Sequence, residues 1–467
     1  RALVCGTRGR WFESTLLYQK MVKEKKLKPS KELPLGFIDR QERELILRDF
    51  VISNIKGVMR KYGFQYLETP SFEYTDSIGK FLPDKDRPDQ GVFSFKDGKN
   101  WLSLRYDLTA PLARYVAKNY LEIPKPFKRY QIGTVWRNEK PGVGRYREFL
   151  QFDADYVGTK NLQADAELCV LISEILEGCG LSKSEYTVKI SSRKFTKELL
   201  NELKINSAEQ SSITLRALDK LDRLGWTEVK KLLGKGRKDK SGDFTKGANL
   251  NDKQIELLEK KMKDSTPITQ DVLEIMKIFE YYKFSNFIYD PSIIRGLEYY
   301  TGIIFEVYLN MEFSDSKGKS FQFGAIGGGG RYDNLVSNFG NFDCPATGIS
   351  IGIDRLIYVL LAKRGGAPDA FWTSKPVVVC VLNKSNFQTY VDITKKLRSS
   401  NINAEIYPGE GKLKKQMEYA NKIGSPAVIL YGDDEKKIGK VTLRNLETGK
   451  ENSIGIDNLT NEIKKLL

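Results

Sequence analysis

Two strand-like segments separated by a charged turn constrain the fold of this chain more than any other feature. The first covers residues 130–136 and the second covers residues 149–157. The segment between them contains Pro141, Gly142 and Gly144, and proline and glycine are typical of turns. This arrangement predicts a long antiparallel hairpin.

Both signs of charge lie on the predicted hairpin. It carries four arginines, Arg129, Arg137, Arg145 and Arg147. Asp153 and Asp155 are two residues apart, so they share one face of the second strand. Cations suit a polyphosphate, and carboxylates suit an ammonium group or the amine of a base. Solvated charges on a surface hairpin explain the pattern equally well, because charged side chains are mostly exposed.

The size and charge of the chain favour several domains and a polyanionic partner. At about 150 residues per domain, 467 residues suggest roughly three domains. Lysine and arginine together exceed aspartate and glutamate by 16, which favours a nucleic acid or nucleotide partner. A basic surface that is merely solvated is the alternative.

Several classes of site are excluded by composition. The five cysteines are scattered with no CxxC pair, so we expect no metal site and a reducing compartment. No apolar run reaches the ~18 residues that a membrane span needs, so we expect no membrane contact. The chain contains no histidine, which removes imidazole as a base, nucleophile or metal ligand.

Shifts in pattern divide the chain into five segments. Residues 1–30 form a basic extension, of which residues 1–20 could be a targeting remnant. Residues 31–182 and 287–370 are rich in strand patterns, whereas residues 183–286 are mostly helical with a lysine-rich middle. Those lysines are either solvated or in contact with an RNA backbone. Residues 375–467 alternate strands and helices as one α/β domain suited to binding.

Four local features each allow two interpretations. A helix from Asp39 to about Tyr62 has an apolar stripe that fits a core or a dimer contact, with core as the default. Asp107 either caps the following helix or binds a ligand. The four glycines of residues 327–330 permit either close backbone approach to a ligand or a tight bend. Arg355 lies in the first turns of a helix, where a cation opposes the helix dipole and a phosphate partner would suit it.

Taken together, these segments resemble the histidyl-tRNA synthetases, a family of class II aminoacyl-tRNA synthetases. The helix and strand that end at Pro70 resemble motif 1, the hairpin resembles motif 2, and TGISIGIDRL resembles motif 3. RGLEYYTG at residues 295–302 and GGGRYD at residues 328–333 resemble the histidine-specific boxes of the family. The resemblance implies an α+β fold: an antiparallel-sheet catalytic core with a helical insertion, followed by a C-terminal α/β anticodon-binding domain.

The resemblance also implies an activity. Such an enzyme ligates L-histidine to tRNA(His) in two steps through a histidyl-adenylate, using ATP with Mg²⁺ and releasing AMP and pyrophosphate. The attacking carboxylate is already ionised, so the first step needs no general base and a chain without histidine can perform it. The family further implies a homodimer through the motif 1 helix and a cytoplasmic location, or an organelle if residues 1–20 are a targeting remnant.

The family motifs assign roles to two groups of residues. For ATP, Arg137 would bind the α-phosphate, Glu139 the adenine amine and Arg355 the γ-phosphate, with Arg145 nearby. Arg295 would lie beside the α-phosphate and the substrate carboxylate, so Arg137 and Arg295 are the expected catalytic residues. For histidine, Asp107, Thr109 and Gln151 would hold the ammonium group. The expected readers of the two imidazole nitrogens are Asp155, Tyr299 and Tyr300.

Two other functions compete with this interpretation. One is a catalytically inactive, histidyl-synthetase-like regulatory subunit or histidine sensor, and the other is a class II enzyme for a different amino acid. Arg137, Arg295 and Arg355 occur together with residues 375–467, which favours the enzyme over the sensor. The two tyrosines of RGLEYYTG favour histidine over another amino acid.

Overall fold

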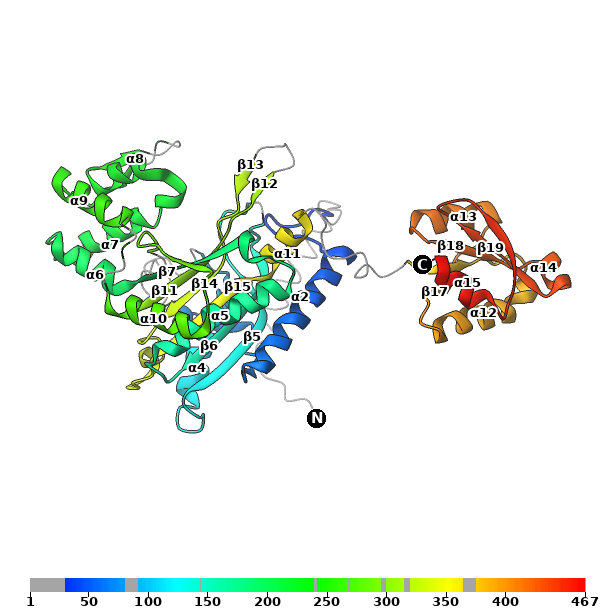
Figure 1. Ribbon diagram of the computed structural model, residues 1–467, viewed down its shortest axis with the longest axis horizontal. Coiled ribbons are helices and arrows are strands. Elements are labelled where there is room, and N and C mark those ends of the chain that lie inside the picture. Colours follow the sequence, from blue (N-terminus) through cyan, green and yellow to red (C-terminus); the bar gives the residue numbers. More distant parts are fainter. Residues whose placement is uncertain are drawn as a thin grey trace. The chain divides into compact units, whose positions relative to one another are not determined.

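The structure is a computed structural model that describes most of the chain (Figure 1). The described residues are 30–79, 91–142, 144–238, 242, 244–264, 266, 269–294, 300–314, 320–363 and 375–466. The chain separates into two compact units, residues 1–367 and residues 368–467. Each unit is described on its own below.

An eight-stranded sheet forms the centre of the first unit (Figure 1). Its strand order is β1-β5-β6-β15-β14-β11-β7-β10, antiparallel except for the outer pairs β1–β5 and β7–β10. The strands are β1 Gln65–Tyr66, β5 Phe127–Trp136, β6 Glu148–Val157, β7 Tyr186–Ser192, β10 Phe287–Tyr289, β11 Ile303–Leu309, β14 Ala325–Arg331 and β15 Ala346–Gly352. The predicted hairpin is confirmed as β5 and β6, two ten-residue strands in continuous register from Phe127 opposite Val157 to Trp136 opposite Glu148.

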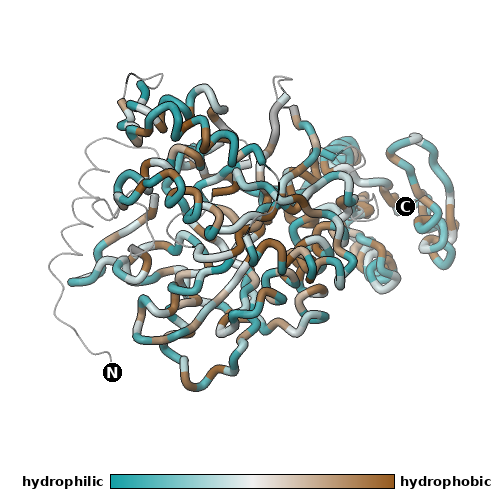
Figure 2. The backbone as a smooth tube through the Cα atoms, turned by 60° about the vertical axis from the view of Figure 1, so that its left-hand side comes forward, coloured by the Kyte–Doolittle hydropathy of each residue, from teal (hydrophilic) through white to brown (hydrophobic). Residues whose placement is uncertain are grey.

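Four helices pack with this sheet into one hydrophobic core. They are α2 Glu42–Lys61, α5 Leu162–Gly178, α10 Gln270–Tyr282 and α11 Ile353–Ala362. Figure 2 shows hydrophobic segments running through the interior of this unit. The apolar stripe of α2, which includes Leu47, Val51 and Ile55, is buried in this core. Each such side chain contributes about 1.5–3 kcal/mol when fully buried. The stripe is therefore core, as the default interpretation predicted, and it is not available to a partner chain.

The four-glycine run forms neither a bend nor a ligand loop. Residues 327–330 lie inside strand β14, between β11 and β15. A Cβ atom on Gly329 would lie 2.0 Å from the backbone oxygen of Gly348 and 2.6 Å from Cε2 of Phe305. The backbone is closely approached at these glycines, but the approaching groups belong to the neighbouring strands β11 and β15 and not to a ligand.

A small sheet flanks the hairpin. Strands β2 Phe72–Tyr74, β3 Ser94–Asp97 and β4 Asn100–Leu104 are arranged in the order β2-β4-β3. Helix α3 Thr75–Gly79 follows β2, and helix α4 Thr109–Lys118 follows β4. Two short strands, β12 Glu312–Ser314 and β13 Ser320–Gln322, form a separate two-stranded sheet. Among the residues of this unit that the structure describes, η1 Lys183–Glu185 and η2 Val336–Phe339 are short 3-10 helices.

The helical segment is narrower than the range predicted for it. Within residues 183–286, β7 belongs to the central sheet, and α10 packs into the main core through residues such as Ile275 and Phe279. A second hydrophobic cluster, which runs from Phe195 to Met262 with Ile294, holds the remaining elements together. These elements are α6 Arg193–Glu202, α7 Ala208–Leu218, α8 Leu221–Leu233, β8 Gly236–Lys238, β9 Phe244–Lys246 and α9 Asp252–Lys263.

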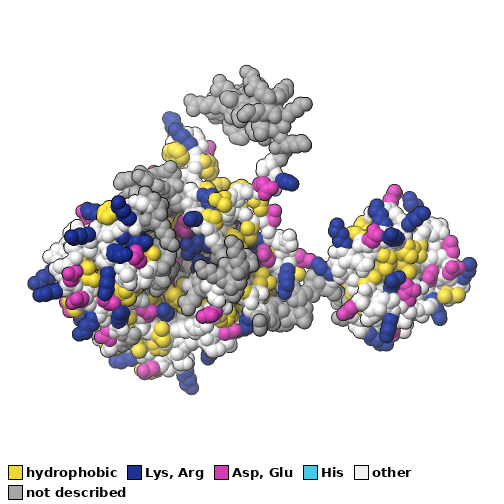
Figure 3. All heavy atoms as spheres, turned by 90° about the horizontal axis from the view of Figure 1, so that it is seen from above, with side chains coloured by type: hydrophobic (Ala, Val, Ile, Leu, Met, Phe, Trp, Pro, Cys, Tyr) yellow, Lys and Arg dark blue, Asp and Glu magenta, His cyan; other side chains and the backbone are white. Residues whose placement is uncertain are grey.

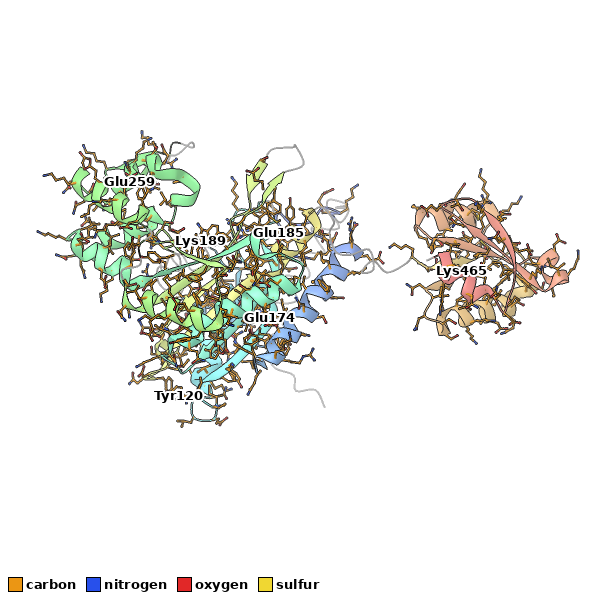
Figure 4. The ribbon with its side chains drawn as sticks, in the orientation of Figure 1. Tyr120, Glu174, Glu185, Lys189, Glu259 and Lys465 are labelled. Carbon is orange, nitrogen blue, oxygen red and sulfur yellow. The ribbon has the colours of Figure 1, made fainter. Side chains whose placement is uncertain are left out.

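Several lysines of this helical segment form ion pairs with neighbouring acids. Glu259, which Figure 4 labels, accepts from Lys230 and Lys263 at 2.6 Å in both cases. Lys231 and Lys261 pair with Glu228 and Glu202, respectively. Figure 3 shows the same interspersion of basic and acidic side chains over the face that it presents. These pairs fit the solvated interpretation of the lysine-rich stretch.

The second unit is a five-stranded sheet covered by helices. The strand order is β17-β16-β18-β19-β20, with the first three parallel and the last two antiparallel. In chain order the elements are β16 Val377–Val379, η4 Lys384–Asn386, α12 Phe387–Ser399, β17 Ala404–Ile406, α13 Leu413–Lys422, β18 Ala427–Leu430, α14 Asp433–Ile438, β19 Lys440–Asn445, β20 Glu451–Gly455 and α15 Leu459–Leu466. Over the described parts of both units, no helix has the length and apolar character needed to cross a membrane.

The environment of Gly329 leads to a stability prediction. The Gly329→Ala variant forces β14 away from β15, and we expect it to lower the free energy of unfolding by about 3 kcal/mol. Gly57→Ala is the matched control. Gly57 lies in the middle of helix α2, and a Cβ atom there would have no other atom within 4 Å. That variant should instead gain about 0.5–1 kcal/mol from helix propensity. Thermal unfolding of both variants measures the difference, and similar midpoints would contradict the packing argument.

Candidate active site

The hairpin, the connection before α4 and the start of α11 carry most of the described residues that were predicted for the site. Gln151, in β6, is opposite Gly352 of β15, directly before α11. Asp354 fastens the two elements, because its Oδ2 accepts from the backbone N–H of Leu150 at 2.7 Å. The same carboxylate forms two hydrogen bonds with Arg40, at 2.8 and 3.1 Å. Arg355 is therefore held close to the hairpin by the residue that precedes it.

Arg137 is held between two aromatic rings. Its guanidinium carbon lies 4.5 Å from the ring centroid of Tyr106 and 5.1 Å from that of Phe149. Its Nε donates to the backbone oxygen of Tyr106 at 3.3 Å, and its Nη2 donates to Oε1 of Gln151 at 3.4 Å. Cation–π contacts of this kind stabilise a guanidinium by about 0.5–2 kcal/mol each. The structure thus joins Arg137 to Gln151, although the motifs assigned them to different substrates.

Asp107 caps the helix that follows it. Its Oδ1 accepts from the backbone N–H groups of Thr109 at 3.1 Å and of Ala110 at 2.9 Å, at the start of α4. This confirms the capping interpretation of Asp107. Burial is the main cause that raises the pKa of this carboxyl, while its hydrogen bond from Ala110 opposes the rise.

Two further acids, Asp153 and Asp155 of β6, belong to a buried polar network. Thr109 Oγ1 donates to Asp153 Oδ2 at 3.2 Å, and Gln151 Nε2 donates to Asp153 Oδ1 at 2.8 Å. Asp155 Oδ2 lies 3.3 Å from Nη2 of Arg129, and Asp155 Oδ1 accepts from the hydroxyl of Tyr332. The two aspartates are each 1% exposed, so solvated charges do not explain this face of the hairpin.

The pKa values of these acids reflect burial opposed by one cation. Burial raises the pKa of Asp155 to about 7, and the guanidinium of Arg129 is the principal influence that lowers it. Burial also raises the pKa of Asp153, again against Arg129. Arg129 is itself 0% exposed. One arginine therefore opposes the rise in pKa of two buried carboxyls, and the Asp155 carboxyl holds part of its protons near neutrality.

Tyr300 lies against the same network. It precedes β11 and is close to β14, since a Cβ atom on Gly330 would lie 3.0 Å from its Cδ1. Burial is the first cause that raises the pKa of its phenol, followed by the negative charges of Asp153, Glu306 and Asp155. The structure therefore brings Tyr300 together with the acid cluster, as the family motifs implied.

The other residues predicted for the site have no contact with this acid network among the interactions described, or are themselves not described. Arg295 and Tyr299 lie outside the described residues. Arg145 is exposed, and its backbone N–H and C=O both bond to Gly142 within the turn. Glu139 is also exposed, and it accepts from the hydroxyl of Tyr106 at 2.7 Å. Arg355 is half-buried, with Nη1 donating to the backbone oxygen of Ala325 and its guanidinium 5.5 Å from the ring centroid of Phe323.

Sequence reasoning missed three members of the site. The family motifs assigned no substrate role to Arg129, yet it is the cation beside the buried acids. Asp153 was recognised only as sharing a face with Asp155, and that two-residue spacing was the available signal. Tyr332 belongs to the GGGRYD box, but no local pattern shows that its hydroxyl reaches β6 from the end of β14.

A groove of about 1040 Å³ lies beside the start of β11 and the end of β14. Thr301, Gly302 and Arg331 are among its lining residues, together with residues from the starts of α5, α6 and α10. Arg331 pairs with the buried Asp165 and donates to the backbone oxygens of Thr159 and Asn161. The groove therefore adjoins the histidine boxes but does not include Asp107 or Arg137.

The balance of charge around Arg129 can be tested by unfolding. Arg129→Met keeps the length of the side chain and leaves two buried carboxyls without their cation, so we expect a loss of about 3–5 kcal/mol in the free energy of unfolding. Arg60→Met, at an exposed position of α2, should change it by only about 0.5 kcal/mol. Urea unfolding measures both values. An Arg129→Met variant as stable as Arg60→Met would show that the buried charge is not needed.

Comparison with known proteins places these features in a family. The family described as histidyl-tRNA synthetase matches residues 36–356, and an anticodon binding domain family matches residues 376–466. The histidine–tRNA ligase of Rhodopseudomonas palustris (strain TIE-1) is 44% identical over 469 residues, which cover 92% of this chain and 91% of the relative. That of Caulobacter vibrioides is 42% identical over 457 residues, again covering 92% of this chain and 91% of the relative.

Solved structures share the fold. The histidyl-tRNA synthetase of Nostoc sp. PCC 7120 superimposes with a TM-score of 0.69 at 24% identity, covering 94% of this chain and all of that one. A Bacillus halodurans protein described as an ATP phosphoribosyltransferase regulatory subunit/histidyl-tRNA synthetase gives a TM-score of 0.62 at 22% identity, covering 84% of this chain and 97% of that one. The expected α+β fold, with an antiparallel catalytic sheet and a separate C-terminal sheet domain, is confirmed, and the chain belongs to the histidyl-tRNA synthetase family.

Proposed function

We propose that this chain ligates L-histidine to tRNA(His) in two steps, through a histidyl-adenylate, with release of AMP and pyrophosphate. The observation that carries the proposal is the joining of Arg137, held between two rings, to a buried acid network through Gln151. A fixed guanidinium suits a phosphate, and a network of partly neutralised carboxyls suits a cationic amino acid. Curated relatives that share over 40% of their residues with this chain carry the same activity in their names.

In the proposed first step the enzyme contributes position and charge. Arg137 binds the α-phosphate of ATP, Glu139 accepts from the adenine amine, and Arg355 binds the γ-phosphate, with Arg145 beside the nucleotide. Arg295 lies at the α-phosphate and the histidine carboxylate. Mg²⁺ accompanies the ATP phosphates as part of the substrate. The histidine carboxylate attacks the α-phosphorus and pyrophosphate leaves, so no side chain needs to take a proton.

Histidine occupies the acid network in this proposal. Asp107 holds the ammonium group with Thr109 and Gln151, and Oδ2 of Asp107 is suited to this because the helix cap uses Oδ1. Asp155, Tyr299 and Tyr300 read the two imidazole nitrogens. An ionised Asp155 accepts from one ring N–H, and Arg129 favours that ionised form. A site that bonds both nitrogens rejects analogues that lack one of them, by a large factor.

The second step transfers the histidyl group to the terminal ribose of the tRNA. The C-terminal unit, residues 375–467, binds the anticodon arm, a role supported by the family match over residues 376–466. Helix α13 presents Lys414, Lys415 and Lys422 to solvent, where they suit phosphate contacts. Residues 193–263 form the insertion within the catalytic domain. The reaction requires tRNA and ATP, so we place the enzyme in the cytoplasm, or in an organelle that has its own translation.

We also propose a homodimer, through the small sheet β2-β4-β3 rather than through the stripe of α2. One face of this sheet exposes Phe72, Tyr74 and Phe95, and these residues are 48%, 56% and 43% exposed. Phe72 and Phe95 meet edge to face at 5.4 Å, and Leu102 lies opposite both Tyr74 and Phe95 on the same face. An apolar face of this kind is typical of a surface covered by a partner.

The dimer proposal predicts the effect of charge on this face. The double variant Phe72→Glu/Phe95→Glu should sediment as a monomer, because two carboxylates cannot be buried against a second copy without partners. Tyr281→Glu is the control, since Tyr281 is 86% exposed on α10 and lies outside this sheet. Analytical ultracentrifugation distinguishes the two variants. A double variant that stays dimeric would place the contact elsewhere.

The catalytic proposal is tested by histidine-dependent exchange of pyrophosphate into ATP. We expect exchange with histidine but not with other amino acids, and a fall of at least about 100-fold for Arg137→Ala, because a contact made in the transition state is lost. Charging of tRNA with labelled histidine should follow the same pattern. Histidine binding without exchange would instead support the regulatory subunit or sensor. Exchange with a different amino acid would support the other class II enzyme.

A further inference from the structure

Tyr106 touches both residues that the proposed function assigns to the adenine and the α-phosphate. It lies in the short connection between β4 and α4, and its side chain is half-buried. Its ring covers Arg137 at 4.5 Å, and its backbone oxygen accepts from Arg137 Nε at 3.3 Å. Its hydroxyl donates to Oε1 of Glu139 at 2.7 Å. One side chain therefore links two positions that lie on either side of Asn138.

Glu139 needs a hydrogen-bond partner to fix its carboxylate, because its side chain is exposed. It follows β5 at the start of the exposed turn, where a free glutamate side chain explores many rotamers. Holding such a side chain still costs up to about 1.5–2 kcal/mol of conformational entropy. The hydroxyl of Tyr106 fixes one carboxylate oxygen before any ligand arrives, and the other oxygen stays available to accept a hydrogen bond.

The hydroxyl of Tyr106 keeps its proton at the pH values where such an enzyme works. Burial raises the pKa of this phenol to about 12, against the opposing charge of Arg137. The negative charges of Glu139 and Asp107 add to the rise. A phenol that stays protonated is a donor throughout, which is the polarity that a carboxylate acceptor requires.

We propose that Tyr106 is a positioning residue for the nucleotide, with a separate task for each part of its side chain. The hydroxyl sets the Glu139 carboxylate at the place where the adenine amine binds, and the ring sets the Arg137 guanidinium at the α-phosphate. This inference rests on the proposed function. The hydroxyl donates to Glu139, which the proposed function assigns to the nucleotide and not to histidine, so removal of the hydroxyl alone should leave histidine recognition unchanged.

The two tasks are separated by two variants. Tyr106→Phe removes the hydroxyl and keeps the ring, so KM for ATP should rise roughly ten-fold while kcat and KM for histidine stay near their original values. Tyr106→Leu removes the ring as well, so kcat should also fall, roughly ten-fold or more, because Arg137 loses its fixed position. Tyr146→Phe, another hydroxyl deletion close to the hairpin, is the control and should leave all three constants unchanged.

A double-variant cycle with Glu139→Ala distinguishes positioning from packing. If the hydroxyl acts through Glu139, adding Tyr106→Phe to Glu139→Ala should raise KM for ATP no further. A purine triphosphate that lacks the amine should likewise show equal KM values in the original enzyme and in Tyr106→Phe. Additive effects, an unchanged KM for ATP, or an equal rise in KM for histidine would overturn the inference.

Direct binding of ATP keeps this test independent of the proposed function. Should the original protein show no exchange with histidine, calorimetry with ATP alone still compares it with Tyr106→Phe. Weaker ATP binding by the variant then supports the role of Tyr106 although the proposed reaction has failed. Equal ATP binding by the two proteins overturns the inference whichever way the exchange assay falls.

Discussion

The buried ion pair between Arg129 and Asp155 is the interaction on which the candidate site depends. Arg129 is fully buried in the central sheet, where an unpaired guanidinium would be very costly. Asp155 and, at longer range, Asp153 balance its charge, and the hydroxyl of Tyr332 completes the arrangement. Gly348 leaves room for it, since a Cβ atom there would lie 2.0 Å from Oδ1 of Asp155. The polar network beneath the proposed histidine site is therefore inseparable from the packing of β5, β6 and β15.

A second charged contact fixes the other end of the hairpin, where β6 begins. Asp354 binds Arg40 and the backbone N–H of Leu150, so the start of α11 is attached to β6 beside Gln151. Gln151 in turn contacts both Arg137 and Asp153. Nucleotide and amino-acid residues thus share one rigid frame. A reaction that relies on position and electrostatics rather than on proton transfer benefits directly from such a frame.

The absence of histidine from the chain is consistent with this chemistry. Carboxylates, phenols, one hydroxyl, one amide and arginines supply the contacts to histidine and ATP that the proposal requires, and none of them has to act as a base in the first step. The group at this site that titrates close to neutrality is instead the buried Asp155, whose pKa burial raises to about 7. The environment of this carboxyl, rather than an imidazole, would give the site any dependence on pH in that range.

The sequence by itself determined the local elements and the identity of the motifs. The spacing of residues 130–157 predicted the hairpin, the stripe of α2 predicted a core helix by default, and a helix cap was one of two interpretations of Asp107. Only the tertiary structure decided which residues of the same type are buried and which groups they contact. Arg129 is buried as a counter-ion, whereas Arg147 is only half-buried and contacts Leu35 and Phe93, because the two arginines lie toward opposite ends of the hairpin. The four glycines of β14 face strands that are distant in sequence, so no local pattern could distinguish a crowded strand from a loop.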